Sequence, residues 1–328
     1  MNRSKIDISV VVPLFNEAGN VEPLHAALRS ALDKTGRSFE IVLVNDGSTD
    51  ETLSVLTRIA GSDDHVVVVS LAGNSGQTGA LAAGFDHSSG RIVISMDGDL
   101  QHDPAEIPMF LEGIAEGYDI VSGWRKHRID PYFSRKLPSR IANYMMAKIS
   151  GIDLHDFGTT YKAYRREVLK NVHLYGEFHR FIPALVEGMR IRIKEIPIRS
   201  IPRKKGKSNY TISRTFTVFF DLIRIRFLTR YLNRPLKVFG TIGGILGLIG
   251  FCIAFYLALL KFTIGISIMQ YRAPLFLLSI LLMLVGTQFL TMGLLGEIMV
   301  KLYFRLPGTK IYCLDQIIRK DAESDFNE

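Results

Sequence analysis

Two long apolar runs near the C-terminus constrain this chain more than any other feature. Residues 238–260 carry no charge, and residues 273–300 carry only Glu297. Each run exceeds the ~20 residues that a helix needs to cross a hydrocarbon layer of about 30 Å. Because only 12 residues separate them, we predict a transmembrane hairpin. Two core helices of a soluble protein are the competing interpretation, but adjacent runs of this length are rare in globular cores.

Lysine and arginine are distributed unevenly around these runs. Five lie within residues 224–237, five within residues 301–320, and two in the connecting residues 261–272. Ten cations thus flank the pair of runs, whereas two lie between them. By the positive-inside rule, this difference predicts that both termini are in the cytoplasm. The first residues run into a strand-like stretch without a small-residue cleavage site, which argues against a signal peptide. We therefore expect a multi-pass protein of the inner (plasma) membrane with its soluble part in the cytoplasm.

Composition divides the chain into four predicted parts. These are a cytoplasmic domain (1–205), a basic amphipathic segment at the membrane interface (206–235), the two spans with their loop (236–302) and a cytoplasmic tail (303–328). Cys252 lies in a span and Cys313 in the tail. Two isolated cysteines argue against a disulfide framework or a zinc site.

Positive charge is concentrated just before the first span. Residues 201–237 contain ten Lys or Arg and one acid, a net charge of +9, whereas the whole chain carries +8. Basic residues alternate there with aromatic and aliphatic ones, which is typical of a helix lying on a membrane surface. Each cation near an anionic leaflet contributes about 1 kcal/mol. Nucleic acid is the rival partner, but the span immediately downstream favours the lipid bilayer, so we expect no nucleic acid.

The first half of the chain alternates two kinds of segment. Short β-branched runs at 8–12, 40–44, 66–70 and 91–96 predict buried strands, and amphipathic segments near 18–34, 49–60, 75–87 and 104–116 predict helices. Such alternation indicates an α/β fold with a mostly parallel sheet covered by helices on both faces. Ligands of these sheets bind beyond the carboxyl ends of the strands.

The most specific chemical signal is Asp97-Gly98-Asp99, which directly follows the fourth predicted strand. Two carboxylates this close are costly without a cation beside them. Mg²⁺ and Mn²⁺ prefer oxygen ligands and commonly bridge phosphates, and Gly98 permits a close backbone approach. A solvated turn is the alternative. Asp46 and Glu17 at neighbouring strand ends favour the metal-binding interpretation.

Other nucleotide-binding motifs fit poorly. No G-x-G-x-x-G follows the first strand, which argues against a dinucleotide site. The glycine-rich segment at 73–79, GNSGQTG, follows the third strand instead. Gly206-Lys207-Ser208 resembles the end of a Walker A motif, but Ile201 stands where the first glycine should be.

Four ordered motifs, VVPLFNE, VNDGSTDET, DGDLQHDP and RKKGKSNY, resemble those of family 2 glycosyltransferases. With the predicted hairpin, the chain is similar to their polyprenyl-phosphate branch, such as bactoprenol glucosyltransferases and dolichol-phosphate mannose synthases. The resemblance implies a GT-A (Rossmann-like) fold and inverting transfer of glucose from UDP-glucose to undecaprenyl phosphate. Mannose, N-acetylglucosamine and aminoarabinose remain alternative donor sugars.

Two other functions remain open. A processive polysaccharide synthase would need a longer membrane channel and usually a Q-x-x-R-W type motif, whereas this chain has two predicted spans and one tryptophan, Trp124. A non-catalytic membrane scaffold derived from the same fold would be expected to have a broken D-x-D. Both carboxylates are intact here.

The resemblance also implies roles for individual residues. The expected nucleotide-sugar ligands are Pro13, Phe15, Glu17, Asp46, Asp97, Gln101 and Arg125. The expected metal ligands, for Mg²⁺ or Mn²⁺, are Asp97, Asp99 and Gln101. The expected lipid-phosphate ligands are Arg135, Lys207 and Arg214. The residues expected to act in catalysis are Asp99, Asp156, Arg203 and Lys205.

Asp156 resembles a family residue that faces the sugar and is often assigned as a base. A phosphate monoester is already largely ionised near neutral pH, since its second pKa is about 6, so this acceptor needs no strong base. Asp156 could instead position sugar or acceptor, or cap the turn with Gly158. We expect neighbouring His155 to be a surface histidine or one whose hydrogen bonds are satisfied within the protein.

The first span also contains closely spaced glycines. Gly240 with Gly244, and Gly243 with Gly247, form small-xxx-small pairs that permit close helix approach. They favour a homo-oligomer, although packing of the two spans on each other explains them almost as well.

Overall fold

The computed structural model describes residues 6–126, 143, 147, 152, 154–170, 182–185, 191–199, 201, 235–265, 268–305 and 310–320. The chain divides into two compact units, Met1–Leu222 with Lys310–Glu328, and Ile223–Thr309. Five residues with predicted roles lie outside the described residues: Arg135, Arg203, Lys205, Lys207 and Arg214. Nearly all of the predicted interface segment 206–235 lies outside them as well.

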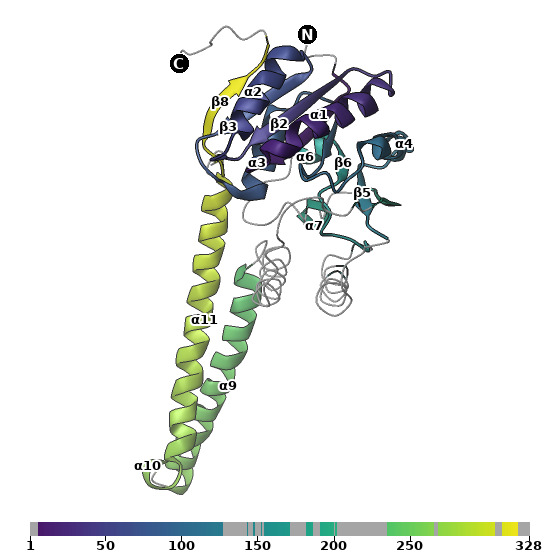
Figure 1. The fold of residues 1–328 in the computed structure, drawn as a ribbon. Helices are drawn as coiled ribbons and strands as arrows, with labels where there is room; N and C mark the ends of the chain where they lie inside the picture. The colour runs from purple at the N-terminus through teal and green to yellow at the C-terminus, as the bar shows by residue number, and fades with distance from the viewer. Residues whose placement is uncertain are drawn as a thin grey trace. The chain divides into compact units, whose positions relative to one another are not determined.

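The first unit is built on an eight-stranded sheet in the order β7-β5-β6-β4-β1-β2-β3-β8 (Figure 1). The strands are β1 (Ile8–Leu14), β2 (Phe39–Asn45), β3 (Val66–Leu71), β4 (Ile92–Ser95), β5 (Ile120–Trp124), β6 (Lys162–Arg165), β7 (Ile193–Pro197) and β8 (Leu314–Ile318). The pairs β1–β2, β1–β4, β2–β3 and β5–β7 are parallel. Strands β6 and β8 pair antiparallel with their neighbours, so the sheet is mixed.

Helices connect the parallel strands, as the sequence predicts. They are α1 (Ala18–Asp33), α2 (Thr52–Ser62), α3 (Gly76–His87), the 3₁₀ turn η2 (Pro104–Glu106) with α4 (Ile107–Ala115), and the short α6 (Arg166–Leu169) and α7 (Ile182–Leu185). All four predicted strands and the four predicted helices between and after them are present. The predicted α/β fold class is confirmed.

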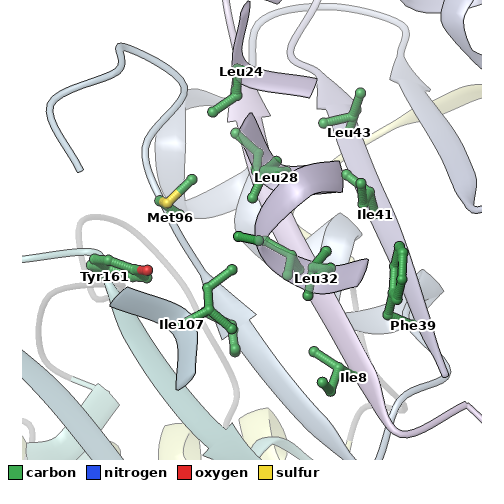
Figure 2. Packing of buried hydrophobic residues seen from close by; sticks show 14 of the residues in the cluster. Ile8, Leu24, Leu28, Leu32, Phe39, Ile41, Leu43, Met96, Ile107 and Tyr161 are labelled. Carbon is green, nitrogen blue, oxygen red and sulfur yellow. The ribbon is translucent and has the colours of Figure 1, made fainter. Parts of the chain in front are cut away.

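Alternate side chains of β1 explain why helices cover both faces of the sheet. Ile8, Val10 and Val12 belong to one hydrophobic cluster with residues of α1, α2 and α4, whereas Val11 belongs to another with residues of α3. This alternation follows from the two-residue period of a strand. Figure 2 shows the first cluster, where Leu24, Leu28 and Leu32 of α1 lie over the strands. The strand ends are therefore held rigidly from both sides.

The last strand of the sheet comes from the tail after the second apolar helix. β8 pairs antiparallel with β3, and the hydroxyl of Tyr312 donates to Asp86 at 2.8 Å. Lys320 forms an ion pair with Asp64 at 2.7 Å. Described residues of the expected tail thus form part of the sheet.

The second unit contains two long apolar helices, α9 (Pro235–Ile264) and α11 (Ala273–Arg305), with the short α10 (Ile268–Tyr271) between them (Figure 1). Residues 235–264 and 273–299 are long and apolar enough to cross a membrane. Most of their surface is exposed, which is not what a soluble core helix shows. A Cβ on Gly243 would lie 2.5 Å from the Gly286 carbonyl oxygen, and one on Gly250 would lie 2.8 Å from that of Ser279. Close packing within the hairpin therefore uses these two glycines, and oligomerisation stays a prediction.

Candidate active site

The loops after β1 and β2 are hydrogen bonded to each other. The amide N–H of Asn16 donates to Ser48 Oγ at 3.1 Å, and the N–H of Thr49 donates to Asn16 Oδ1 at 2.8 Å. Asn16 adopts φ 54°, a conformation in which asparagine is enriched. Glu17 N–H donates to Thr52 Oγ1 at 3.0 Å. The neighbouring Phe15 is 43% exposed, so its ring can meet a ligand at this edge.

Asp46 is buried at the carboxyl end of β2. Its carboxylate accepts the N–H of Ser75 at 2.7 Å. Burial raises the pKa of Asp46, while hydrogen bonds from the backbone of Ser75 and Gly76 oppose that rise. In this structure Asp46 therefore holds the turn between β3 and α3. Its predicted contact with a nucleotide base stays a prediction.

The D-G-D segment is tightly constrained. A Cβ on Gly98 would lie 2.4 Å from Leu14 Cδ2 and 3.2 Å from the Pro13 carbonyl oxygen, so a larger residue would require the buried Leu14 side chain to move. Leu100 adopts φ 60°, which is a genuine outlier for a bulky residue and is typical of functional segments. Asp97 Oδ1 accepts from Gln77 Nε2 at 2.6 Å, and Asp99 Oδ1 accepts the N–H of Gln101 at 3.2 Å.

The buried His102 ring lies close to the Asp97 carboxylate. Its Nδ1 is 4.0 Å from Asp97 Oδ2, and among the described residues this buried atom has no hydrogen-bond partner. The pKa of His102 is lowered, mainly by burial. The negative charges of Asp97, Asp99 and Asp156 oppose this shift, whereas the positive charge of Arg125 adds to it. The charged groups of the D-G-D segment and of the Arg125–Asp156 pair therefore all act electrostatically on this ring.

Arg125 and Asp156 form a two-pronged ion pair. The distances are 2.7 Å from Nε to Oδ2 and 3.0 Å from Nη2 to Oδ1. Asp156 Oδ1 also accepts the N–H of Gly158 at 3.2 Å, as the predicted turn cap requires. Arg125 follows β5, whereas Asp156 precedes β6, and these two strands are paired. The sheet thus brings together two predicted residues that are 31 positions apart.

Glu195 on β7 accepts hydrogen bonds from the backbone segment that carries Asp156. Its carboxylate accepts the backbone N–H groups of His155 and Asp156, both at 2.9 Å, and lies 2.8 Å from His155 Nδ1. The His155 ring stacks on Trp124 with centroids 4.5 Å apart. His155 is exposed, as expected, but its ring is held on both sides. Glu195 is a residue that the sequence did not single out.

The chain that leads into the basic segment is attached beside the D-G-D segment. The N–H of Ile201 donates to the Gln101 carbonyl at 3.0 Å, and that of Arg199 donates to Glu106 Oε1 at 2.9 Å. The basic residues themselves lie beyond the described part. Ile201, the last described residue before the predicted phosphate-binding loop, therefore lies next to Gln101, a predicted metal ligand.

The donor set suits a hard divalent cation that also binds phosphate. Asp97 and Asp99 offer carboxylate oxygens from one short segment, and Asp97 is already oriented by a neutral amide. Within the described residues, no three Asp, Glu, His or Cys side chains are grouped to enclose an ion. Mg²⁺ is commonly held by one or two carboxylates plus substrate phosphates rather than by a protein cage. The residues present fit that arrangement, with Gln101 as a predicted third ligand.

Comparison with known proteins identifies the family. Residues 9–172 match the family model of glycosyl transferase family 2. The dodecaprenyl-phosphate galacturonate synthase of Rhizobium johnstonii is 39% identical over 323 residues, which cover 97% of this chain and 95% of that protein. The chain belongs to glycosyl transferase family 2. The predicted family and the predicted enzyme class, a glycosyltransferase, are confirmed.

Other relatives of this glycosyltransferase carry related names. The undecaprenyl-phosphate 4-deoxy-4-formamido-L-arabinose transferase of Pseudomonas paraeruginosa is 35% identical, with 95% of this chain and 90% of that protein covered. The corresponding enzyme of Edwardsiella ictaluri is 34% identical, with 98% and 97% covered.

A solved structure shares the fold of this glycosyltransferase. It is the glucosyl-3-phosphoglycerate synthase of Mycobacterium tuberculosis with Mn²⁺ and UDP-glucose, at a TM-score of 0.52 and 20% identity. The match covers 68% of this chain and 79% of that one. At this identity the likeness shows the fold alone.

Proposed function

We propose that this glycosyltransferase moves a sugar, with inversion, from a nucleotide sugar to a polyprenyl phosphate at the cytoplasmic face of the inner membrane. The observation that carries the proposal is the D-G-D segment at the end of β4, with Asp97 oriented by Gln77. The names of full-length relatives support polyprenyl phosphate as the acceptor. The two long apolar helices would place the enzyme beside such a lipid.

We assign the donor to the loops after β1, β2 and β4. Pro13, Phe15 and Glu17 would contact base and ribose, and the exposed ring of Phe15 supports that role. Asp97, Asp99 and Gln101 would hold Mg²⁺ or Mn²⁺. When bound, the cation would supply Lewis-acid neutralisation of the leaving diphosphate. Arg125, whose guanidinium is oriented by Asp156, would lie at the same edge as a preorganised polar group of the kind that lowers barriers.

Asp156 acts in this proposal by position rather than as a base. Both of its oxygens accept from Arg125, which orients the guanidinium. The acceptor oxygen needs little deprotonation, since a phosphate monoester is largely ionised near neutral pH. The acceptor would therefore attack the anomeric carbon directly, with Asp156 holding Arg125 in place.

The basic segment is proposed to bind the phosphates of both substrates. Arg203, Lys205 and Lys207 follow Ile201, whose N–H is anchored to Gln101, and Arg135 and Arg214 are proposed to meet the lipid phosphate. The combined change of Arg203→Ala and Lys205→Ala should raise KM for donor or acceptor. Lys204→Ala is the matched control. Unchanged KM values for both substrates in the double variant would mean that this loop only contacts lipid.

The donor sugar is the least constrained part of the proposal. Glucose follows from the resemblance, whereas the curated relatives are named for galacturonate and 4-deoxy-4-formamido-L-arabinose. We propose UDP-galacturonate as the first donor to test, since its carboxylate suits a site with Arg125 and the exposed Lys126. Formamido-arabinose comes second and glucose third.

Connectivity supports the proposed topology. β8 follows α11 and pairs with β3, which precedes α9, and this pairing agrees with a spanning hairpin whose two ends would lie on one side of the membrane. We assign that side to the cytoplasm because the flanks of the hairpin are rich in Lys and Arg. Cys313, which is exposed, should resist an impermeant thiol reagent in intact cells. Labelling of Cys313 there would reverse the assignment.

A donor panel tests the function. Purified full-length protein in nanodiscs is incubated with undecaprenyl phosphate, Mn²⁺ or Mg²⁺ and radiolabelled nucleotide sugars, with Asp99→Asn as the inactive control. We expect one lipid product that carries a single sugar. A polymer would identify a processive synthase. No lipid-linked product from any donor would overturn the proposal.

A further inference from the structure

The glycine-rich segment GNSGQTG (73–79) joins β3 to α3, and the function proposed above uses only the hydrogen bond that its Gln77 donates to Asp97. It lies between two carboxylates that follow different strands, Asp46 after β2 and Asp97 after β4. The backbone of Ser75 and Gly76 donates to Asp46, and the side chain of Gln77 donates to Asp97. The turn therefore connects these two acids physically.

The Asp46 side fixes the turn. The carboxylate accepts the N–H of Ser75 at 2.7 Å, and Asn74 Oδ1 accepts that of Gly76 at 3.1 Å. A Cβ on Gly47, which adopts φ 65°, would lie 2.5 Å from the carbonyl carbon of Gly73. Backbone therefore packs on backbone here, and α3 begins at a defined place.

The Gln77 side reaches the D-G-D segment. Gln77 lies in the first turn of α3 and donates to Asp97 Oδ1 at 2.6 Å. The other oxygen, Oδ2, faces the buried His102 ring at 4.0 Å. An amide orients a carboxylate without cancelling its charge, whereas a lysine or arginine in that place would compete with an incoming cation.

We propose that Gln77 is a positioning residue that sets the Asp97 carboxylate for a divalent cation. The inference rests on the metal dependence of the proposed function. Hydrogen bonds to metal-binding carboxylates fix their orientation, and their loss typically costs 10–100-fold in metal affinity or activity. Asp46 contributes by holding the turn that carries Gln77. The segment thus serves a cation site rather than a dinucleotide.

Manganese binding tests the inference apart from turnover. Full-length protein in detergent is titrated with Mn²⁺ in the presence of inorganic pyrophosphate, and free Mn²⁺ is read by electron paramagnetic resonance. Gln77→Ala should raise the Mn²⁺ dissociation constant about 10–100-fold. Asn74→Ala removes a side-chain hydrogen bond to Gly76 but leaves the Ser75–Asp46 and Gln77–Asp97 bonds in place, so it should stay close to the wild type.

Replacing Gln77 by lysine tests whether the donor to Asp97 must be neutral or whether any hydrogen-bond donor is sufficient. Gln77→Lys keeps a donor but brings a positive charge to Asp97, so it should bind Mn²⁺ even more weakly than Gln77→Ala. Wild-type affinity in Gln77→Ala, or in Gln77→Lys, would overturn the inference. Absence of Mn²⁺ binding in the wild type would instead remove the metal assignment of the proposed function, and the inference with it.

Discussion

Asp97 and Asp156 lie in one neighbourhood but are held in opposite ways. The Asp97 side chain is 31% exposed and accepts from the neutral amide of Gln77. The Asp156 side chain is 5% exposed and accepts two bonds from the Arg125 guanidinium. The first carboxylate is oriented with its charge available to a ligand, and the second is neutralised by the protein itself.

This difference separates two tasks. A partly exposed acid without a bonded cation can bind a metal ion reversibly, and that ion can in turn bind phosphate. A buried acid needs a permanent partner, because burying an unpaired charge is very costly. Asp97 and Asp99 are therefore placed to act on the ligand, whereas Asp156 acts on Arg125. Four substitutions, in order of decreasing effect, test that division.

Asp99→Asn tests the metal-binding side. Removing one carboxylate charge should cost roughly 4 kcal/mol of transition-state stabilisation, or about a thousandfold in turnover. Transfer to undecaprenyl phosphate measures the rate, and circular dichroism checks the fold. Asp103→Asn, in the same loop, is the control and should keep most activity. Full activity of the wild type in excess EDTA would contradict the metal assignment.

Arg125→Ala tests the neutralised side. Removing one partner of a buried pair typically costs about 3–5 kcal/mol, and a loss of about 3 kcal/mol corresponds to about 6–12 °C in Tm for a domain of this size. Combining it with Asp156→Ala should restore part of that loss, because no buried charge is then left over. Thermal unfolding of all three variants measures this. A Tm near the wild type in Arg125→Ala would mean that the pair is effectively solvated.

Glu195→Gln tests the support behind Asp156. The amide cannot accept every bond that the carboxylate receives from His155 and Asp156, so we expect a loss of about 1–3 kcal/mol. Trp124 is the only tryptophan and stacks on His155, so its fluorescence reports the local change. Unaltered emission together with unaltered Tm would show that Glu195 does not fix this corner.

Glu106→Gln tests a third carboxylate, which is buried like Asp156 but bonded to a neutral donor like Asp97. Burial raises the pKa of Glu106 above its ordinary value of 4.5, opposed by the N–H of Arg199. Folding therefore favours the protonated acid, and stability falls as pH rises from 4.5 through the raised folded pKa. The variant should lose that pH dependence, with a change below about 1 kcal/mol near neutral pH. An unchanged stability profile between pH 4 and 8 would contradict this.

The first four strands were predictable because their signal is local. Apolar runs such as Val66–Leu71 can only be buried, and the helices between them carry a clear apolar face. Strands β5, β6 and β7 are short and have no such signal. β6 lies antiparallel between β4 and β5 although it follows both in the chain, an arrangement that depends on long-range pairing.

The residues of the site divide in the same way. Asp97, Asp99 and Asp156 stand in recognisable motifs, and the structure brings them into one neighbourhood. Gln77 and Glu195 act through partners 20 and 40 positions away, so no local pattern reveals them. The glycine spacing around Gln77 was the one available signal, and it indicated a tight turn without indicating what the turn holds.

The place of β8 in the sheet has a consequence for how the protein is made. The ribosome completes β3 long before β8, and both apolar helices are synthesised in between. Until the tail emerges, the nascent chain presents the open edge of β3, and open edges invite pairing with other chains. The eight-stranded sheet can therefore be completed only after both apolar helices have left the ribosome.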